Sequence, residues 1–99
     1  MAMMEISVVP LGTGKTSVSP YIAEIFKFLR KQKKVRYELN GMGTILTGKA
    51  GDLFKLAAQL HRIPLARGAQ RVYTVIKLDE RKDKAQLPIE KVDSVLRKL

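Results

Sequence analysis

The clearest strand signal in the chain is the stretch Arg71-Val72-Tyr73-Thr74-Val75-Ile76-Lys77-Leu78. It is rich in β-branched and aromatic residues, which favour strands. Side chains alternate between the two faces of a strand, so Val72, Ile76 and Leu78 share one face. Tyr73 and Val75 share the other. Because both faces carry apolar side chains, each is expected to need a covering layer.

Three strands are expected before this one, at residues 3–10, 34–39 and 44–48. The first is partly alternating and β-branched, and it ends at Pro10, since proline cannot donate to a strand ladder. The second and third are separated by Asn40-Gly41, a strong hairpin signal. The sequence therefore predicts four strands.

Two helices are expected between the strands. Ser19-Pro20 starts the first with an N-cap and a proline at the first helical position, and apolar residues at helical spacing follow to about Lys33. Asp52 is the expected N-cap of the second helix, which Pro64 should bend or end. Gly68 is its expected C-cap.

A last helix is expected from about Leu87, because apolar residues recur there at helical spacing. They are Ile89, Val92, Val95, Leu96 and Leu99. The element order is then βαββαβ followed by a helix. This is the ferredoxin-like α+β arrangement, a four-stranded antiparallel sheet with two helices on one face. Residues 1–99 are expected to form a single domain of this kind.

Two helices cover only one face of such a sheet. The other face is expected to carry Val9, Tyr73 and Val75, which are apolar enough to call for a cover. The C-terminal helix offers a cover within the chain, and a second subunit stacked sheet on sheet offers another. We favour the second subunit and expect a homo-oligomer.

The composition narrows the classes of function. The chain has no cysteine and one histidine, His61, so it offers no disulfide framework and no metal site built on thiolates or histidines. Residues 1–5 lack the pattern of a signal peptide, and no stretch approaches the roughly 20 apolar residues of a membrane helix. We expect a cytoplasmic protein without membrane contact. The net charge of +10 makes nucleic acid a partner to weigh.

Two motifs resemble signatures of other function classes. Gly12-Thr13-Gly14-Lys15-Thr16 follows a strand and precedes a helix, but Val9 stands where a phosphate loop needs its first glycine. RNA-recognition modules share this strand order and stack bases on aromatic residues, chiefly of the third strand, whereas Thr44-Ile45-Leu46-Thr47 contains none. A basic RNA- or DNA-binding module on this fold is the alternative function. No nucleophile–base pair is visible, so we expect no enzymatic activity.

Four motifs follow one another along the chain. They are Val9-Pro10-Leu11-Gly12-Thr13-Gly14 with Ser17-Val18-Ser19, then Gly41-Met42-Gly43-Thr44, then Gly68-Ala69-Gln70-Arg71-Val72, then Ile76-Lys77-Leu78-Asp79-Glu80-Arg81-Lys82-Asp83-Lys84. Together they resemble the small thiamine-binding protein family. The resemblance implies a ferredoxin-like fold, a homotetramer built by sheet packing, and binding of thiamine or its hydroxymethylpyrimidine part. It implies no reaction and no cofactor. The family's third strand commonly ends in Glu-Gly, where this chain has Thr47-Gly48.

A ligand of this class suggests the candidate site residues. An aminopyrimidine needs a few hydrogen-bonding groups and an apolar or aromatic wall. The candidates are the hydroxyls of Ser7, Thr13, Ser17 and Thr44, a carboxylate from Glu38 or Glu5, and a ring from Tyr37 or Tyr73. We expect residues 12–17 and 42–44 to contribute to one pocket. No catalytic residue and no metal-binding residue is expected.

Overall fold

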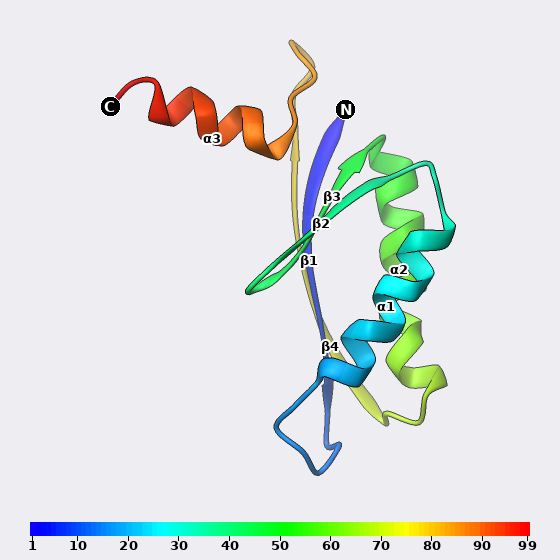
Figure 1. Cartoon of the computed structure of the whole chain (residues 1–99). Coiled ribbons are helices and arrows are strands. Elements are labelled where there is room, and N and C mark those ends of the chain that lie inside the picture. Colours follow the sequence, from blue (N-terminus) through cyan, green and yellow to red (C-terminus); the bar gives the residue numbers. More distant parts are fainter.

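The alternating stretches form one four-stranded sheet, and the segments with helical spacing form three helices (Figure 1). The structure, a computed structural model, describes residues 1–99. In chain order the elements are β1 (Ala2–Leu11), α1 (Ser19–Lys31), β2 (Arg36–Asn40), β3 (Gly43–Gly48), α2 (Ala50–Ala66), β4 (Arg71–Glu80) and α3 (Pro88–Leu96). This order confirms the predicted ferredoxin-like α+β fold with an added C-terminal helix.

The strands lie in the order β2-β3-β1-β4, and each neighbouring pair is antiparallel. Ile6 of β1 pairs with Thr44 of β3 on one side and with Ile76 of β4 on the other. Residues directly opposite each other point to the same face. The even-numbered residues of β1 and β4 therefore share one face, and the odd-numbered residues, Tyr73 and Val75 among them, share the other, as predicted.

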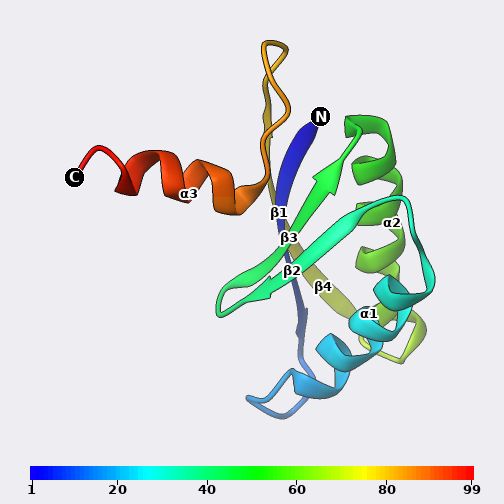
Figure 2. The same cartoon turned by 45° about the horizontal axis from the view of Figure 1, so that its top comes forward.

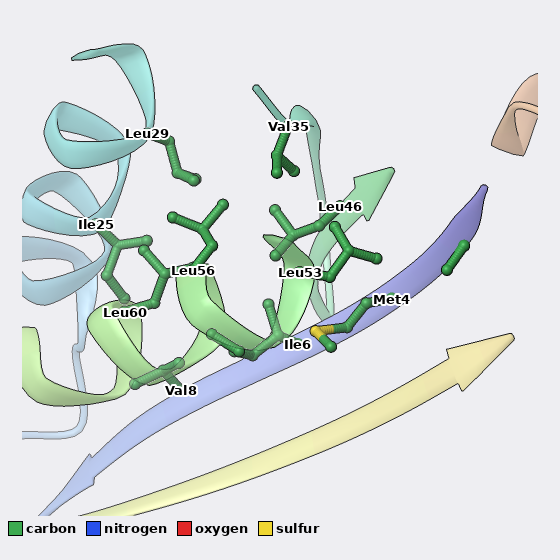
Figure 3. Packing of buried hydrophobic residues seen from close by; sticks show 12 residues of the cluster. Met4, Ile6, Val8, Ile25, Leu29, Val35, Leu46, Leu53, Leu56 and Leu60 are labelled. Atoms are coloured by element: carbon green, nitrogen blue, oxygen red, sulfur yellow. The ribbon is translucent and has the colours of Figure 1, made fainter. Parts of the chain in front are cut away.

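The core fills the space between one face of the sheet and the helices α1 and α2 (Figure 3). We call this side of the sheet the covered face. Its buried apolar residues are Ala2, Met4, Ile6 and Val8 of β1, Leu46 of β3, Ile25 and Leu29 of α1, and Leu53, Leu56, Ala57 and Leu60 of α2, together with Val35. Burial of these side chains stabilises both the sheet and the two helices that pack on it.

The start of α1 differs from the prediction by one residue. Its N-cap is Val18 rather than Ser19. The carbonyl of Val18 accepts hydrogen bonds from the backbone N–H groups of Tyr21 and Ile22, at 3.0 and 3.1 Å. The hydroxyl of Ser19 makes no capping bond and instead accepts one from the hydroxyl of Ser17, at 3.4 Å.

The end of α1 and the start of β2 are organised by one side chain. The amide of Gln32 donates to the carbonyls of Leu29 and Val35, at 3.2 and 2.8 Å, and accepts from the N–H of Val35 at 3.0 Å. These bonds occupy backbone groups that a longer helix or strand would use. For this reason α1 ends at Lys31 rather than about Lys33, and β2 begins at Arg36 rather than at residue 34.

The second helix also departs from the prediction at both ends. Its N-cap is Lys49 rather than Asp52, and Asp52 lies in the first turn, where its negative charge suits the helix dipole. Pro64 lies inside α2 and does not end it, since the N–H of Arg67 still donates to the carbonyl of Ile63 at 3.2 Å. Gly68 follows the helix with a φ of +101°, a conformation that glycine adopts readily.

The open face of the sheet is the face that α1 and α2 leave uncovered. Its apolar residues include Met3 and Val9 of β1, Ile45 of β3, and Tyr73 and Val75 of β4. Figures 1 and 2 show α3 on the open-face side, projecting away from the sheet. The cover that α3 was considered to offer within the chain is therefore not formed. None of the helices is both long and apolar enough to cross a bilayer.

Candidate functional site

The β2–β3 hairpin forms one wall of the candidate site. Its turn is closed by Asn40, whose side-chain oxygen accepts a hydrogen bond from the N–H of Met42 at 2.9 Å. Gly43 follows, and its backbone lies so close to β1 that an added Cβ would be 2.8 Å from the carbonyl oxygen of Ile6. Glycine permits this approach because it has no Cβ. The hairpin is thus held tightly against β1.

The sheet has a step where β1 runs past β3. β1 has ten residues and β3 has six. The last pair between them joins Ile6 to Thr44, so residues 7–11 pair with β4 on one side and with no strand on the other. Backbone N–H and C=O groups on that free edge need other partners. A ligand placed at this step could supply them.

A hollow of about 350 Å³ lies at this step, between the hairpin, β1 and the start of α1. We call it the hairpin hollow. Its lining includes Ser7, Val9, Val18, Ile22, Leu39, Asn40, Met42, Gly43 and Thr44. The volume lies within the range of about 300–1,000 Å³ that is typical of small-molecule pockets.

The hairpin hollow is mainly apolar and carries no charged side chain. The polar residues among those that line it are Ser7, Asn40 and Thr44. Thr44 is only 7% exposed, so a group that meets its hydroxyl is largely removed from water. An ion placed there would lose hydration without gaining a charged partner. The lining therefore suits an uncharged, flat ring with polar edges.

The glycine-rich loop between β1 and α1 borders a different hollow. Gly12 and Gly14 adopt φ values of +74° and +76°, which tighten the loop. The hydroxyl of Thr13 donates to the carbonyl of Lys15 at 3.1 Å. This loop hollow, of about 390 Å³, is lined by Thr13, Lys15, Ser17, Pro20, Tyr21, Glu24 and Arg67. Unlike the hairpin hollow, it is polar and contains two cations and one carboxylate.

The predicted hydroxyl ligands are divided between these two hollows. Ser7 and Thr44 line the hairpin hollow, whereas Thr13 and Ser17 line the loop hollow. The expected single pocket for residues 12–17 and 42–44 is therefore not formed within one chain. The start of α1 contributes to both hollows, through Val18 in the first and Pro20 and Tyr21 in the second, and keeps the two motifs apart.

Tyr37 and Glu38, the predicted ring and carboxylate, line neither hollow. Tyr37 points to the covered face, where its ring packs edge-on against Phe26 with centroids 5.7 Å apart. Glu38 is exposed and lies opposite Ile45, and Glu5 lies opposite Ile45 from the other side. The two carboxylates therefore share the open face, away from the hairpin hollow.

Several lining residues of the hairpin hollow are absent from the predicted site. Asn40 was assigned only to a turn, and Ile22 is one of the apolar residues at helical spacing that followed Ser19-Pro20. Leu39 was assigned only to a strand, and Val18 only to the motif Ser17-Val18-Ser19. Their common position follows from the different lengths of β1 and β3, which no local motif reveals. The Asn-Gly turn directly before the Met42-Gly43-Thr44 motif was the one usable signal.

The perturbed titratable groups lie outside both hollows, near the end of β4. A hydrogen bond from Lys91, at 2.6 Å, lowers the pKa of Asp79. A hydrogen bond from Arg81 lowers the pKa of Asp83. These exposed ion pairs organise the connection from β4 to α3. No three His, Cys, Asp or Glu side chains are grouped so as to hold a metal ion.

Comparison with known sequences places the chain in a family. A family model described as thiamine-binding protein matches residues 4–96. A UPF0045 protein of Staphylococcus xylosus is 41% identical over 98 residues, which cover 96% of this chain and 92% of the relative. A UPF0045 protein of Methanothermobacter thermautotrophicus is 41% identical over 100 residues, which cover 100% of both chains.

Comparison with solved structures supports the same assignment. A crystal structure from Methanocaldococcus jannaschii matches with a TM-score of 0.82 and 32% identity, over 95% of this chain and 94% of that one. A protein of Thermotoga maritima, described as a candidate thiamine biosynthesis or salvage protein, matches with a TM-score of 0.76 over 95% of this chain and 97% of that one. Its 19% identity shows a shared fold alone. From the family model and the close relatives, this chain belongs to the thiamine-binding protein family.

Proposed function

We propose that this protein binds thiamine or a related hydroxymethylpyrimidine-type molecule, without catalysing a reaction on it, and that the pyrimidine ring occupies the hairpin hollow. One observation carries the proposal. A member of the thiamine-binding family has, at the free edge of β1, an uncharged and mainly apolar hollow of about 350 Å³ with a few polar groups.

The lining matches the chemistry of an aminopyrimidine. The flat faces of the ring would contact Val18 and Ile22 at the start of α1. The ring nitrogens and the amino group would pair with the hydroxyl of Thr44 and with the backbone N–H and C=O groups on the free edge of β1, next to Ser7, since these groups include both donors and acceptors. The lining has no titratable side chain to act as a general acid or base, which supports binding without a reaction.

Calorimetry with thiamine, thiamine diphosphate and free hydroxymethylpyrimidine tests which of these compounds the protein binds. The variant Thr44→Val tests whether the bound compound lies in the hairpin hollow. Loss of one hydrogen bond costs about 0.5–1.5 kcal/mol, so affinity should fall about 2- to 12-fold. Thr47→Val is the matched control. It makes the same change on the same strand at a residue that is also buried but lies outside the hollow, and it should leave affinity unchanged.

Three outcomes would contradict parts of the proposal. Absence of heat with all three compounds would refute the ligand class. Binding that survives Thr44→Val but is lost in Thr13→Val would move the ligand to the loop hollow. A new product, seen by mass spectrometry after prolonged incubation of each compound with the protein, would refute binding without a reaction.

The proposal includes self-association through the open face, as a homotetramer with packed sheets. It is supported by Tyr73 and Val75, which are 59% and 40% exposed on that face. Light scattering should give a mass well above the 11.1 kDa of one chain. Tyr73→Asp should reduce the mass to one chain by placing a charge in a desolvated contact. Lys55→Asp, at an exposed position of α2, should not.

The alternative function, binding of RNA or DNA by a basic module, has less support than ligand binding, because the residues of the open face do not suit base stacking. Its two central strands present Glu5, Ser7 and Ile45 there, with no aromatic ring for base stacking. We expect oligonucleotide affinity of only about 10⁻⁴–10⁻⁶ M, with a steep dependence on salt. Sequence-selective binding that persists at about 200 mM salt would favour the nucleic-acid function instead.

A further inference from the structure

The loop hollow has no part in the proposed function, yet it brings charged side chains from three segments to one concave surface. Lys15 comes from the loop between β1 and α1, Glu24 comes from α1, and Arg67 is the C-cap residue of α2. Lys15 and Arg67 are exposed, so packing of the core does not account for their common position. The hollow therefore has the character of a second ligand site.

A further hollow, of about 400 Å³, continues the loop hollow between α1 and α2, and Glu24 and Arg67 line both. We call the two hollows together the helix groove. Its cationic side chains are those of Lys15, Lys27, Lys31 and Arg67. The only acidic side chain that lines it is Glu24, and the part between the helices also contains the apolar Phe28 and Ile63. The helix groove therefore has an excess of positive charge and one apolar end.

The carboxylate of Glu24 does not cancel this positive charge, because two cations already share it. One of its oxygens accepts a hydrogen bond from Arg67 at 2.6 Å, and the other lies 3.4 Å from the ammonium group of Lys27. A guanidinium group has five N–H donors and an ammonium group has three, so both cations keep donors for another acceptor. The side chain of Arg67 is 59% exposed and that of Glu24 only 25%. An anion that enters the groove therefore has accessible cationic partners.

The glycine-rich loop adds uncharged donors to these cations. The backbone N–H groups of Thr13, Gly14, Thr16 and Ser17 make no hydrogen bond within the chain, and that of Lys15 makes only a long one, to the hydroxyl of Thr13 at 3.4 Å. The hydroxyls of Thr13 and Ser17 line the same hollow. Successive free N–H groups of a turn form concavities that bind anions. Cations combined with free N–H and O–H donors are the groups that bind phosphate oxygens in proteins.

We propose that the helix groove is a second ligand site, which binds a diphosphate group. The phosphate oxygens lie in the loop hollow, where Lys15, Arg67 and the loop N–H groups bind them, and the organic part of a diphosphate ester lies along Phe28 and Ile63. A diphosphate is favoured over a carboxylate because it has enough oxygens to meet both cations and the loop donors. The site differs from the hairpin hollow, whose lining carries no charge, and it does not depend on the proposed function.

Calorimetry of the full chain with pyrophosphate, at low salt, tests the phosphate end of the groove. Arg67→Met should weaken binding about 10- to 100-fold, the loss expected for a hydrogen bond between charged groups. Lys15→Met should also weaken it. Lys55→Met is the matched control, because it makes the same change of charge at an exposed position of α2 that lines neither hollow. Its affinity for pyrophosphate should stay within about twofold of the wild type, since solvent and salt screen a distant charge.

Glu24→Gln tests the groove by a gain of affinity, which a misfolded variant would not show. Loss of the carboxylate releases Arg67 and Lys27 for the ligand, so pyrophosphate should bind several-fold more tightly. Glu80→Gln makes the same change of charge at the exposed end of β4 and should leave affinity unchanged. In NMR spectra, addition of pyrophosphate should shift the amide signals of residues 12–17 and leave those of residues 40–44 in place.

ADP tests the apolar end of the groove and the source of the diphosphate. If the organic part lies along Phe28, ADP should bind more tightly than pyrophosphate. Phe28→Leu keeps an apolar side chain but removes the ring, so it should abolish that difference and leave pyrophosphate binding unchanged. Equal affinities for ADP and pyrophosphate in the wild type would support the diphosphate site and overturn the place given to the organic part.

Several outcomes would overturn the second site. One is absence of heat with both pyrophosphate and ADP. Another is an equal loss in Arg67→Met and Lys55→Met, which would show attraction by the net charge of +10 alone. An oligonucleotide that binds far more tightly than ADP, and is lost in Arg67→Met, would assign the groove to nucleic acid instead. Thr44→Val should leave pyrophosphate binding unchanged, so failure of the proposed function and failure of this site can be told apart.

Discussion

The two faces of the sheet differ sharply in how far their side chains are buried, although the same strands form both faces. On the covered face, Met4, Ile6 and Val8 of β1 are buried against α2 (Figure 3). On the open face, Met3 and Val9 of the same strand remain partly exposed. A shift of one residue along β1 moves a side chain from the core to a surface that awaits a partner, because the side-chain period of a strand is two.

This difference separates stability from function. Burial of apolar area on the covered face supplies most of the free energy that holds the chain together, at about 25 cal/mol per Å². The open face, the exposed apolar residues of α3 and the hairpin hollow contribute less to the folded chain and are available for contacts with other molecules. Substitutions on the two faces should therefore have different consequences.

The largest effect is expected for Leu60→Ala, which empties space at the centre of the covered face. Leu60 belongs to α2 and is fully buried in the core, so loss of its side chain should lower the free energy of unfolding by about 2–5 kcal/mol in urea denaturation. Leu65→Ala, at a 41% exposed position of the same helix, is the control and should cost much less. Equal losses would mean that the core does not lie where the structure has it.

A smaller effect is expected for Gly43→Ala, at the point where the hairpin contacts β1. The new Cβ would lie 2.8 Å from the Ile6 carbonyl oxygen, so the strands must separate, at a cost of about 1–3 kcal/mol. Gly41→Ala is the control, since no atom lies within 4 Å of its added Cβ. The melting temperature should fall only for Gly43→Ala. A fall of equal size in both variants would contradict the close approach.

Most of the fold could be predicted from local patterns. The alternation in residues 71–78 and the Asn40-Gly41 turn indicated strands and a hairpin, and the register confirms the faces assigned to Tyr73 and Val75. The ends of elements were less predictable. Gln32 ends α1 through bonds to the next segment, and Pro64 is tolerated within α2, because contacts outside the local sequence decide both.

The candidate site was predictable only in part. Hydroxyl-rich and glycine-rich motifs indicated Ser7 and Thr44, which do line the hairpin hollow. The hollow itself results from β1 running past β3, and strand length relative to a neighbour is a property of the whole sheet. The role of Tyr37 was also not predictable from the sequence, because an aromatic side chain suits a ligand-binding wall and a hydrophobic core equally. In the structure its ring packs against Phe26.

Val8 and Val9 are neighbours on β1 that point to opposite faces of the sheet, so substituting each one tests the difference between the faces directly. Val8→Ala removes two methyl groups from the covered face and should lower the unfolding free energy by about 1.5 kcal/mol at every protein concentration. Val9→Ala changes the open face, so its effect should grow with concentration as copies associate. Denaturation at several concentrations distinguishes the two. A concentration-independent loss of the same size in both variants would show that no partner covers the open face.

The smallest effect is expected from acid, at the ion pair that joins α3 to β4. The hydrogen bond from Lys91 lowers the pKa of Asp79 below its ordinary value of about 3.9. A carboxyl whose pKa is lowered on folding contributes stability above its unfolded pKa and loses it as pH falls through the lower, folded value. The contribution is small because the pair is exposed and screened by salt. In an NMR titration Asp79 should titrate below its ordinary range, and Lys91→Met should raise its midpoint. Titration of Asp79 at the ordinary value in the wild type would mean that this tether does not hold α3 on the open-face side.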